Sequence, residues 1–311
     1  MRVDGQGPVS PGASANRKVG RFRDDAARRR FMTAYDDALA HWPTPPTELE
    51  VETRYGTTHV LATGSASGTP IVLLHGMAVS SPSWYADIAA LSEHHPVYAI
   101  DTITDAGRSI QRSRVRDGAD LARWLDDVLA ALELSTAHLV GLSYGGWLAL
   151  NQARHSPGRL ASVTAVDPPG AIGRAQGRFL IKILPDSILA LAKSKKALYR
   201  LLRRLNNGTE PGQPLLDLSV AGLLTFRAKQ PYPKRMSDDD LGAIRTPALL
   251  LFCECSPVNH ARRAAERSRQ CISNVTTLVV PDAGHMLPVE KPELFTSTVL
   301  GFTRDVDAEI R

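Results

Sequence analysis

A serine flanked by glycines is the side chain of this sequence best placed to act as a nucleophile. The apolar stretch 137–142 runs into Gly-Leu-Ser-Tyr-Gly-Gly, which puts Ser143 between Gly141 and Gly145, and a helical pattern follows. This spacing is typical of a serine on a sharp turn between a strand and a helix, because a Cβ two residues away on either side would collide with the neighbouring element. At such a helix N-terminus the backbone N–H of Tyr144 favours a developing oxyanion. These residues predict acyl transfer through Ser143.

Two other strand ends supply the groups that such a serine needs. One apolar run ends in His75-Gly76-Met77, so the backbone N–H of Met77 can point to the same oxyanion. The last apolar run leads to His285, and serine first with histidine last is a chain order in which such a catalytic pair occurs. We therefore predict that His285 takes the proton of Ser143, that Met77 and Tyr144 supply the oxyanion N–H groups, and that His75 is structural.

Short apolar runs separated by helical patterns form the elements that carry these residues. Helical patterns occur at about 83–91, 117–133, 145–155, 258–270 and 290–308, and an amphipathic helix within 24–41 and a hairpin within 49–63 precede them. The alternation of strand and helix predicts a mostly parallel, doubly wound α/β sheet. Six runs have the composition of parallel strands buried on both faces: 71–74, 97–100, 137–142, 162–166, 247–253 and 275–280.

The chain divides into three predicted parts. Residues 1–22 are rich in Gly, Pro, Ser and Asn, which predicts a disordered N-terminal tail. Residues 23–167 and 245–311 form the α/β core. Residues 168–244 interrupt the alternation between the sixth and seventh strands, and we expect them to form a helical lid. Its helical patterns lie at 179–184, 188–191, 198–205 and 215–224.

The predicted lid is strongly basic. It contains 13 Lys and Arg residues against six acidic residues. A solvated basic surface is one interpretation of this excess. The others are a preference for an apolar substrate that carries a carboxylate or phosphate, and approach to an anionic membrane. The sequence leaves these alternatives open.

Composition excludes several classes of protein. The 311 residues are 43% hydrophobic and 22% charged with a net charge of +5, which is typical of a soluble globular protein and too weakly basic for most nucleic-acid binders. Cys253, Cys255 and Cys271 exclude a disulfide framework, and no further metal ligands lie at suitable spacing. No apolar run reaches the length of a membrane span, and residues 1–25 lack the apolar core of a signal peptide. We expect a cytoplasmic protein that acts on a small apolar molecule, with or without an acid group. We expect no metal, cofactor, nucleic acid or stable membrane insertion.

Four motifs carry a resemblance to a known family. They are His75-Gly76, the segment Asp105-Ala106-Gly107-Arg108-Ser109, the turn around Ser143 and the pair Gly284-His285. Over about residues 30–305 the sequence thereby resembles the α/β-hydrolase superfamily and, within it, the bacterial serine carboxylesterases. The resemblance implies the α/β-hydrolase fold and a serine hydrolase that cleaves a carboxylic ester through an acyl-enzyme. Thioester, lactone and C–C bond hydrolases use the same parts. Ser143, in place of an aspartate, argues against the epoxide hydrolases and dehalogenases of this fold.

The catalytic acid is missing from its usual place in this family. The resemblance puts the acid after the strand that follows the lid, and that position holds Ser256. A serine cannot balance the imidazolium that forms on His285. We predict that Asp167, at the end of the strand beside the nucleophile strand, replaces it, and Glu254 is the alternative acid. If neither serves, the alternative that we favour is a non-hydrolytic member of the fold, such as a cyclase of a biosynthetic pathway or a ligand-binding scaffold.

Overall fold

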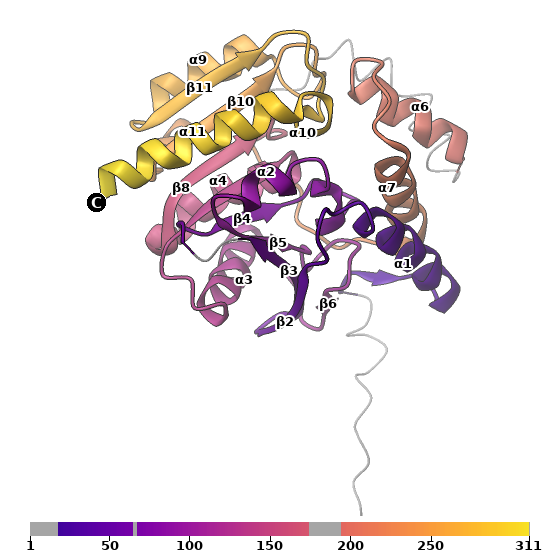
Figure 1. Cartoon of the computed structure of the whole chain (residues 1–311). Coiled ribbons are helices and arrows are strands. Elements are labelled where there is room, and N and C mark those ends of the chain that lie inside the picture. Colours follow the sequence, from indigo (N-terminus) through magenta and orange to yellow (C-terminus); the bar gives the residue numbers. More distant parts are fainter. Residues whose placement is uncertain (1–17, 65–66, 174–193, 311) are drawn as a thin grey trace, which may run out of the picture.

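A sheet of nine strands lies at the centre of the residues that the computed structural model describes, which are 18–64, 67–173 and 194–310 (Figure 1). The strand order is β11-β10-β8-β7-β4-β5-β3-β2, and β6 pairs beside β3. The six neighbouring strands β5, β4, β7, β8, β10 and β11 pair in parallel. Strand β3 is antiparallel to β2, β5 and β6. The strands are β2 (Thr47–Thr53), β3 (Gly56–Gly64), β4 (Ile71–Leu74), β5 (Pro96–Ile100), β6 (Ile110–Gln111), β7 (Ala137–Leu142), β8 (Leu160–Val166), β10 (Ala248–Cys253) and β11 (Val275–Val280).

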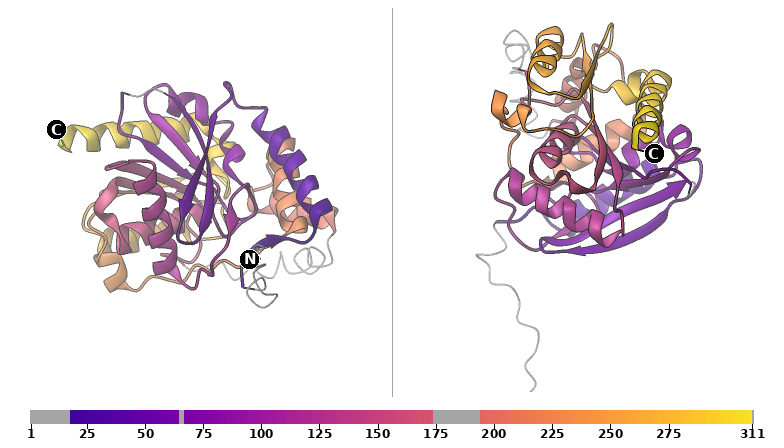
Figure 2. Two further views of the ribbon diagram at one scale, coloured as in Figure 1. Left: turned by 90° about the horizontal axis from the view of Figure 1, so that it is seen from below. Right: turned by 90° about the vertical axis from the view of Figure 1, so that its left-hand side faces the viewer.

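Helices cover both faces of the sheet. One face packs against α3 (Gly118–Ala131), α4 (Tyr144–His155) and α9 (Ala261–Cys271), and the other packs against α2 (Ile88–Ser92) and α11 (Pro292–Ile310). Figure 2 shows α11, in yellow, across the sheet from α3 and α9. Because both faces are covered, β4, β7 and β10 are buried along their whole length. The shorter elements are η2 (Ser81–Trp84), η3 (Pro157–Arg159), α8 (Asp238–Gly242) and α10 (Leu287–Glu290).

The predicted strands and most predicted helices agree with this architecture. The six apolar runs correspond to β4, β5, β7, β8, β10 and β11, and the predicted hairpin to β2 and β3. The expectation of burial on both faces is wrong for β11, because it lies at the edge of the sheet and alternates between half-buried and exposed residues up to Val280. The single helix predicted at 83–91 is wrong, because η2 and α2 are two short pieces separated at residues 85–87. No helix in the described ranges is long and apolar enough to cross a bilayer.

The predicted tail extends too far along the chain. Residues 1–17 lie outside the described part, but β1 (Arg21–Phe22) pairs antiparallel with β9 (Phe226–Arg227). The ring of Phe22 lies 5.1 Å from that of Phe226 and 5.3 Å from that of Phe31, in α1 (Asp25–Leu39). Placing residues 18–22 in a disordered tail is therefore wrong, because one aromatic side chain in a polar segment finds apolar partners that are distant in sequence.

Two helices between β8 and β10 lie at the carboxyl ends of the parallel strands (Figure 1). They are α6 (Lys195–Leu205) and α7 (Gln213–Thr225), within the segment predicted as a lid; the helices predicted at 179–184 and 188–191 lie outside the described residues. Helix α7 packs on α1 and closely approaches the loop after β4. A Cβ at Gly222 would lie only 2.3 Å from the carbonyl oxygen of Ala78, so this contact requires a glycine.

Candidate active site

Ser143 lies on the sharp turn between β7 and α4. Its φ of 55° and ψ of −118° are unusual for a residue with a side chain, and the bond from its N–H to the carbonyl oxygen of Val166 (2.8 Å) holds the turn. A Cβ at Gly141 would lie 2.1 Å from the carbonyl oxygen of Gly145, and one at Gly145 would lie 1.9 Å from that of Leu74. The glycine spacing seen in the sequence is therefore required by the close approach of β7, α4 and β4.

The structure brings Ser143, His285 and Asp167 together from the ends of three strands. The Oγ of Ser143 lies 2.8 Å from Nε2 of His285, and Nδ1 of the same ring lies 2.6 Å from Oδ2 of Asp167. Asp167 directly follows β8, and its backbone N–H donates to the carbonyl oxygen of Leu251 in the neighbouring strand β10 (2.7 Å). The carboxylate is fully buried, and 6% of His285 is exposed. These contacts form a continuous chain of hydrogen bonds from a carboxylate to a hydroxyl.

Two further side chains hold the carboxylate of Asp167. The hydroxyl of Ser256 donates to Oδ2, the same oxygen that contacts His285. The amide of Asn259 donates to Oδ1 (2.9 Å) and to the carbonyl oxygen of Pro168 (3.1 Å). Because Ser256 and Asn259 are fully buried, their donors compensate for the loss of water around the carboxylate. Ser256, at the position where the resemblance implies the acid, thus donates to the carboxylate of Asp167 from the adjacent strand.

Glu254, the alternative acid, points elsewhere. Its carboxylate accepts hydrogen bonds from the Nε (3.0 Å) and Nη2 (2.6 Å) atoms of Arg262, whose side chain is 81% exposed. The neighbouring Cys253 is buried, and burial raises the pKa of its thiol far above the usual range. Neither residue resembles a partner for the imidazole of His285.

Tyr144 and Met77, whose N–H groups are expected at an oxyanion, follow Ser143 in the chain and the neighbouring strand β4, respectively. Tyr144 is the first residue of α4, where backbone N–H groups have no acceptor within the helix. Met77 follows β4, the strand beside β7, and a Cβ at the preceding Gly76 would lie 3.6 Å from Cβ of Ser143. The adjacent His75 is 1% exposed; its ring nitrogens contact the carbonyl oxygen of Gly76 (2.7 Å) and the N–H of Thr102 (3.0 Å).

A buried aspartate fixes the loop that carries Met77. Oδ2 of Asp105 accepts the N–H of Ala78 (2.7 Å), and Oδ1 accepts that of Ala106 (2.8 Å). Ala78 has a φ of 62°, a strained conformation that this hydrogen bond supports. Asp105 is 3% exposed, and burial raises the pKa of its carboxyl.

The loop that carries His285 is held from two sides. The carboxylate of Glu290 accepts the N–H groups of Gly284 (2.7 Å) and Met286 (3.3 Å), and burial raises its pKa. The N–H of His285 donates to the carbonyl oxygen of Leu205, the last residue of α6 (2.9 Å). The position of the histidine therefore depends on α6 as well as on β11.

Comparison with known proteins places these features in a family. A model of the α/β-hydrolase family matches residues 71–298. The chain belongs to the α/β-hydrolase family. This α/β-hydrolase is 31% identical to carboxylesterase YbfK of Bacillus subtilis over 283 residues, which are 88% of this chain and 93% of that protein. An uncharacterized carboxylesterase of the same organism, nap, is 29% identical over 88% of this chain and 92% of its own.

Solved structures agree with this assignment. The crystal structure of carboxylesterase CesB (YbfK) from Bacillus subtilis superposes with a TM-score of 0.81 at 30% identity, over 89% of this chain and 98% of that one. Naproxen esterase from the same organism gives 0.81 at 28% identity, over 90% and 98%. The predicted family and fold are confirmed, and this α/β-hydrolase is a carboxylesterase-like hydrolase.

Three residues around the site were missed or misread in the sequence. Ser256 was interpreted only as an absent acid, and Asn259 and Glu290 were given no role. The only local signal was their position: Asn259 follows Ser256 by three residues, and Glu290 follows His285 by five. What these side chains bind comes from other strands and loops.

Proposed function

We propose that this hydrolase cleaves carboxylic esters through an acyl-enzyme on Ser143. The observation that supports this most directly is the chain of hydrogen bonds of 2.8 Å and 2.6 Å that joins Ser143, His285 and Asp167. In this proposal Ser143 is the nucleophile, His285 the general base and Asp167 the acid. The names of the relatives, carboxylesterase and naproxen esterase, support an ester as the substrate.

The reaction would proceed in two halves. The Oγ of Ser143 attacks the ester carbonyl carbon while Nε2 of His285 takes its proton, and the negative charge on the carbonyl oxygen is received by the N–H groups of Met77 and Tyr144. The protonated His285 then gives the proton to the leaving alcohol, which leaves the acyl group on Ser143. A water molecule, deprotonated by His285, attacks the acyl carbon, and His285 then returns this proton to the Oγ of Ser143 as the acyl–Oγ bond breaks and the acid leaves. Thioesters and lactones would react by the same steps.

Asp167 would make the imidazole an effective base. Its contact with Nδ1 fixes the tautomer that leaves Nε2 free to accept the proton, and its negative charge balances the imidazolium that follows. The donors Ser256 and Asn259 keep this carboxylate oriented in a buried position. The non-hydrolytic alternative depended on the missing acid at Ser256, and the contact between Asp167 and His285 argues against it.

The substrate in this proposal is a small apolar molecule, and residues 168–244 act as its lid over a core formed by 23–167 and 245–311. The close approach of α7 to the loop of Met77, at Gly222, supports a lid beside the oxyanion. The end of α6 supports the histidine loop from the same side.

Labelling by a fluorophosphonate probe tests the nucleophile. The wild-type protein should be labelled on Ser143, as mapped by peptide mass spectrometry, and should hydrolyse p-nitrophenyl butyrate. The Ser143→Ala variant should lose both the label and the turnover. Turnover above a few per cent of wild type in that variant, or a label on another residue, would refute the assignment.

A further inference from the structure

Helix α6 presents a stripe of positive charge. Lys196, Arg200 and Arg203 lie at helical spacings of four and three residues, and the eleven residues of α6 include no acid. Like charges at these spacings repel each other and weaken a helix. An anion bound along the stripe would reduce this repulsion.

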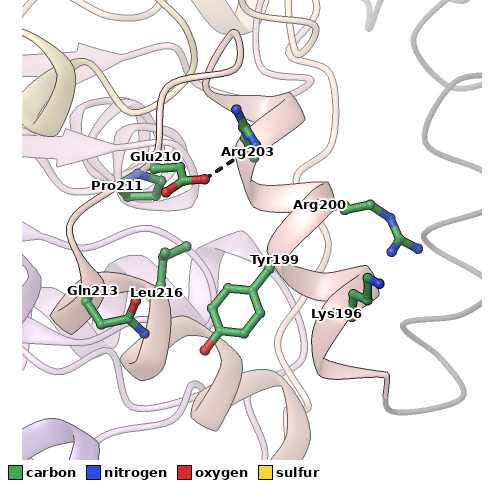
Figure 3. Close-up of a pocket in the computed structure, with 8 residues that line it drawn as sticks. All are labelled: Lys196, Tyr199, Arg200, Arg203, Glu210, Pro211, Gln213 and Leu216. Carbon is green, nitrogen blue, oxygen red and sulfur yellow. Dashed lines mark ion pairs between the residues drawn. The ribbon is translucent and has the colours of Figure 1, made fainter.

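A pocket follows this stripe. Its volume is about 600 Å³, which is within the usual range for a small-molecule site. Figure 3 shows that its lining comes from α6, from the loop after it and from the start of α7. We call it the α6–α7 pocket, and the residues that matter here are Lys196, Tyr199, Arg200, Arg203, Glu210 and Leu216.

The lining combines cationic and apolar groups. The hydroxyl of Tyr199 donates to Oδ1 of Asp217 (2.7 Å), so the tyrosine ring has a fixed position and can contact an apolar ligand together with Leu216. Glu210 contributes one negative charge, and its Oε1 lies 3.4 Å from Nη1 of Arg203. Both side chains of this pair are more than half exposed, so the pair is weak and an anionic ligand can compete with Glu210 for Arg203.

The pocket is connected to the candidate active site through the backbone. Leu205, two residues after Arg203, accepts the N–H of His285 (2.9 Å). A Cβ at Gly284 would lie 2.7 Å from Cα of Asn206, which shows how closely the end of α6 approaches the histidine loop. A ligand that changes the position of α6 therefore acts on the loop that holds His285.

We propose that the α6–α7 pocket binds a small organic acid, with its anionic group on Lys196 and Arg203 and its apolar body on Tyr199 and Leu216. The acid is either part of the ester that is cleaved or a separate effector, and the same contacts serve both. Binding itself does not depend on the function proposed above. Only the kinetic part of the test does.

Calorimetry at low ionic strength tests binding with 4-phenylbutyrate as the probe and the uncharged 4-phenylbutyramide as its match. The acid should bind at least about tenfold more tightly than the amide, and high salt should reduce the difference because the cations are exposed. Lys196→Gln and Arg203→Gln should each weaken binding of the acid about two- to fivefold. Glu210→Gln should strengthen it, because it removes the competitor for Arg203.

Lys196→Gln and Glu210→Gln are expected to change the affinity for the acid in opposite directions. A general loss of folding would weaken binding in both variants, so it cannot produce this result. Arg114→Gln is the matched control, since this exposed arginine lies on the loop between β6 and α3 and its loss changes the net charge by the same amount. Equal binding of acid and amide would overturn the proposal. So would a loss with Arg114→Gln as large as that with Lys196→Gln, or weaker binding in Glu210→Gln.

Turnover of p-nitrophenyl butyrate separates the two sources of the acid. If 4-phenylbutyrate raises KM alone and Lys196→Gln relieves this competition, the pocket holds part of the substrate. If it changes kcat and Lys196→Gln removes the change, the acid is an effector. Binding without any effect on kinetics would overturn the connection to His285. Failure of the wild type to turn over the ester would refute the proposed function and leave the calorimetry valid.

Discussion

Replacing Asp167 by asparagine tests the proposed acid most directly. The amide side chain would keep the size of the original but lose the negative charge 2.6 Å from Nδ1 of His285, and it could donate to Nδ1 and so favour the wrong tautomer. We expect kcat to fall by ~10³ to 10⁴ for p-nitrophenyl butyrate, with folding intact. Stopped assays at saturating ester and circular dichroism of the variant measure the two quantities.

The structure also predicts how this loss can be reversed. The hydroxyl of Ser256 binds the same Oδ2 of Asp167 that contacts His285, so an aspartate at position 256 would extend its carboxylate to the place that this oxygen occupies. We therefore expect the double variant Asp167→Asn with Ser256→Asp to recover at least about tenfold of the lost kcat. We expect recovery to be incomplete, because the loop accommodates the shorter side chain of a serine at this position. Ser256→Asp alone should lower stability, because it buries two carboxylates side by side.

Two variants serve as controls for this series. Ser256→Ala removes one hydrogen bond to a buried carboxylate, which is worth about 1.5–3 kcal/mol, and should lower kcat about tenfold or more without a change in KM. Glu254→Gln should leave kcat within about twofold, because its partner Arg262 is on the surface. The reasoning fails if Asp167→Asn keeps more than a tenth of wild-type kcat. It also fails if Glu254→Gln is the variant that inactivates the enzyme.

Three further outcomes follow from buried groups. Asp105→Asn replaces a charged acceptor of the Ala78 N–H by a neutral amide, so kcat should fall about tenfold at unchanged KM, and an unchanged kcat would remove Asp105 from the oxyanion loop. Gly222→Ala should lower the free energy of unfolding by about 1–3 kcal/mol, because its Cβ would lie 2.3 Å from the carbonyl oxygen of Ala78. Gly301→Ala should not lower it, because a Cβ there would have no atom within 4 Å. Equal effects of the two variants in urea titrations would contradict this prediction. Burial lowers the pKa of His138 from 6.5, its ordinary value, to about 4 in the folded protein. Between these two pH values the folded protein therefore binds fewer protons than the unfolded chain. Stability should therefore fall as pH drops from about 6 to 4.5, by about 1 kcal/mol per unit from this group, and a His138→Gln variant with the same slope as wild type would show that other groups cause it.

The sequence predicted the sheet well because its signal is local. Each of the six apolar runs is long enough to be recognised by itself, and burial on both faces gives β4, β7, β8 and β10 a composition distinct from the helices between. β11, at the edge of the sheet, is half-buried or exposed except at Val280. Ser143 and His285 were predicted as site residues for a related reason, since Ser143 directly follows one such run and His285 lies five residues beyond another. The end of the tail was misplaced because Phe22 is held by Phe226, about two hundred residues later, and no local pattern records that contact.

The surroundings of the site could not be predicted, because they join residues far apart in the chain. Asp167 and Asn259 are 92 residues apart and share a hydrogen bond only because β8 and β10 are neighbours in the sheet. The bond between His285 and Leu205 joins the loop after β11 to the end of α6. Asn, Ser and Glu in loops are also common for local reasons, such as turns and caps, so their types alone indicate no contact.

The neighbouring positions of β8 and β10 also explain how the proposed acid, Asp167, can differ from the position that the family resemblance implies. Val166 pairs with Leu251, so Asp167 and the segment that leads to Ser256 leave the sheet side by side, both at the end that faces His285. A carboxylate from either strand end can therefore reach Nδ1 without a change in the position of the imidazole. When the acid is on β8, the vacated position on β10 must still satisfy a buried, charged oxygen, and a short hydroxyl does so where an apolar side chain would not. In the proposed arrangement, Ser256 is therefore the donor that supports the carboxylate of Asp167 from the adjacent strand, and its presence does not imply that the site lacks an acid.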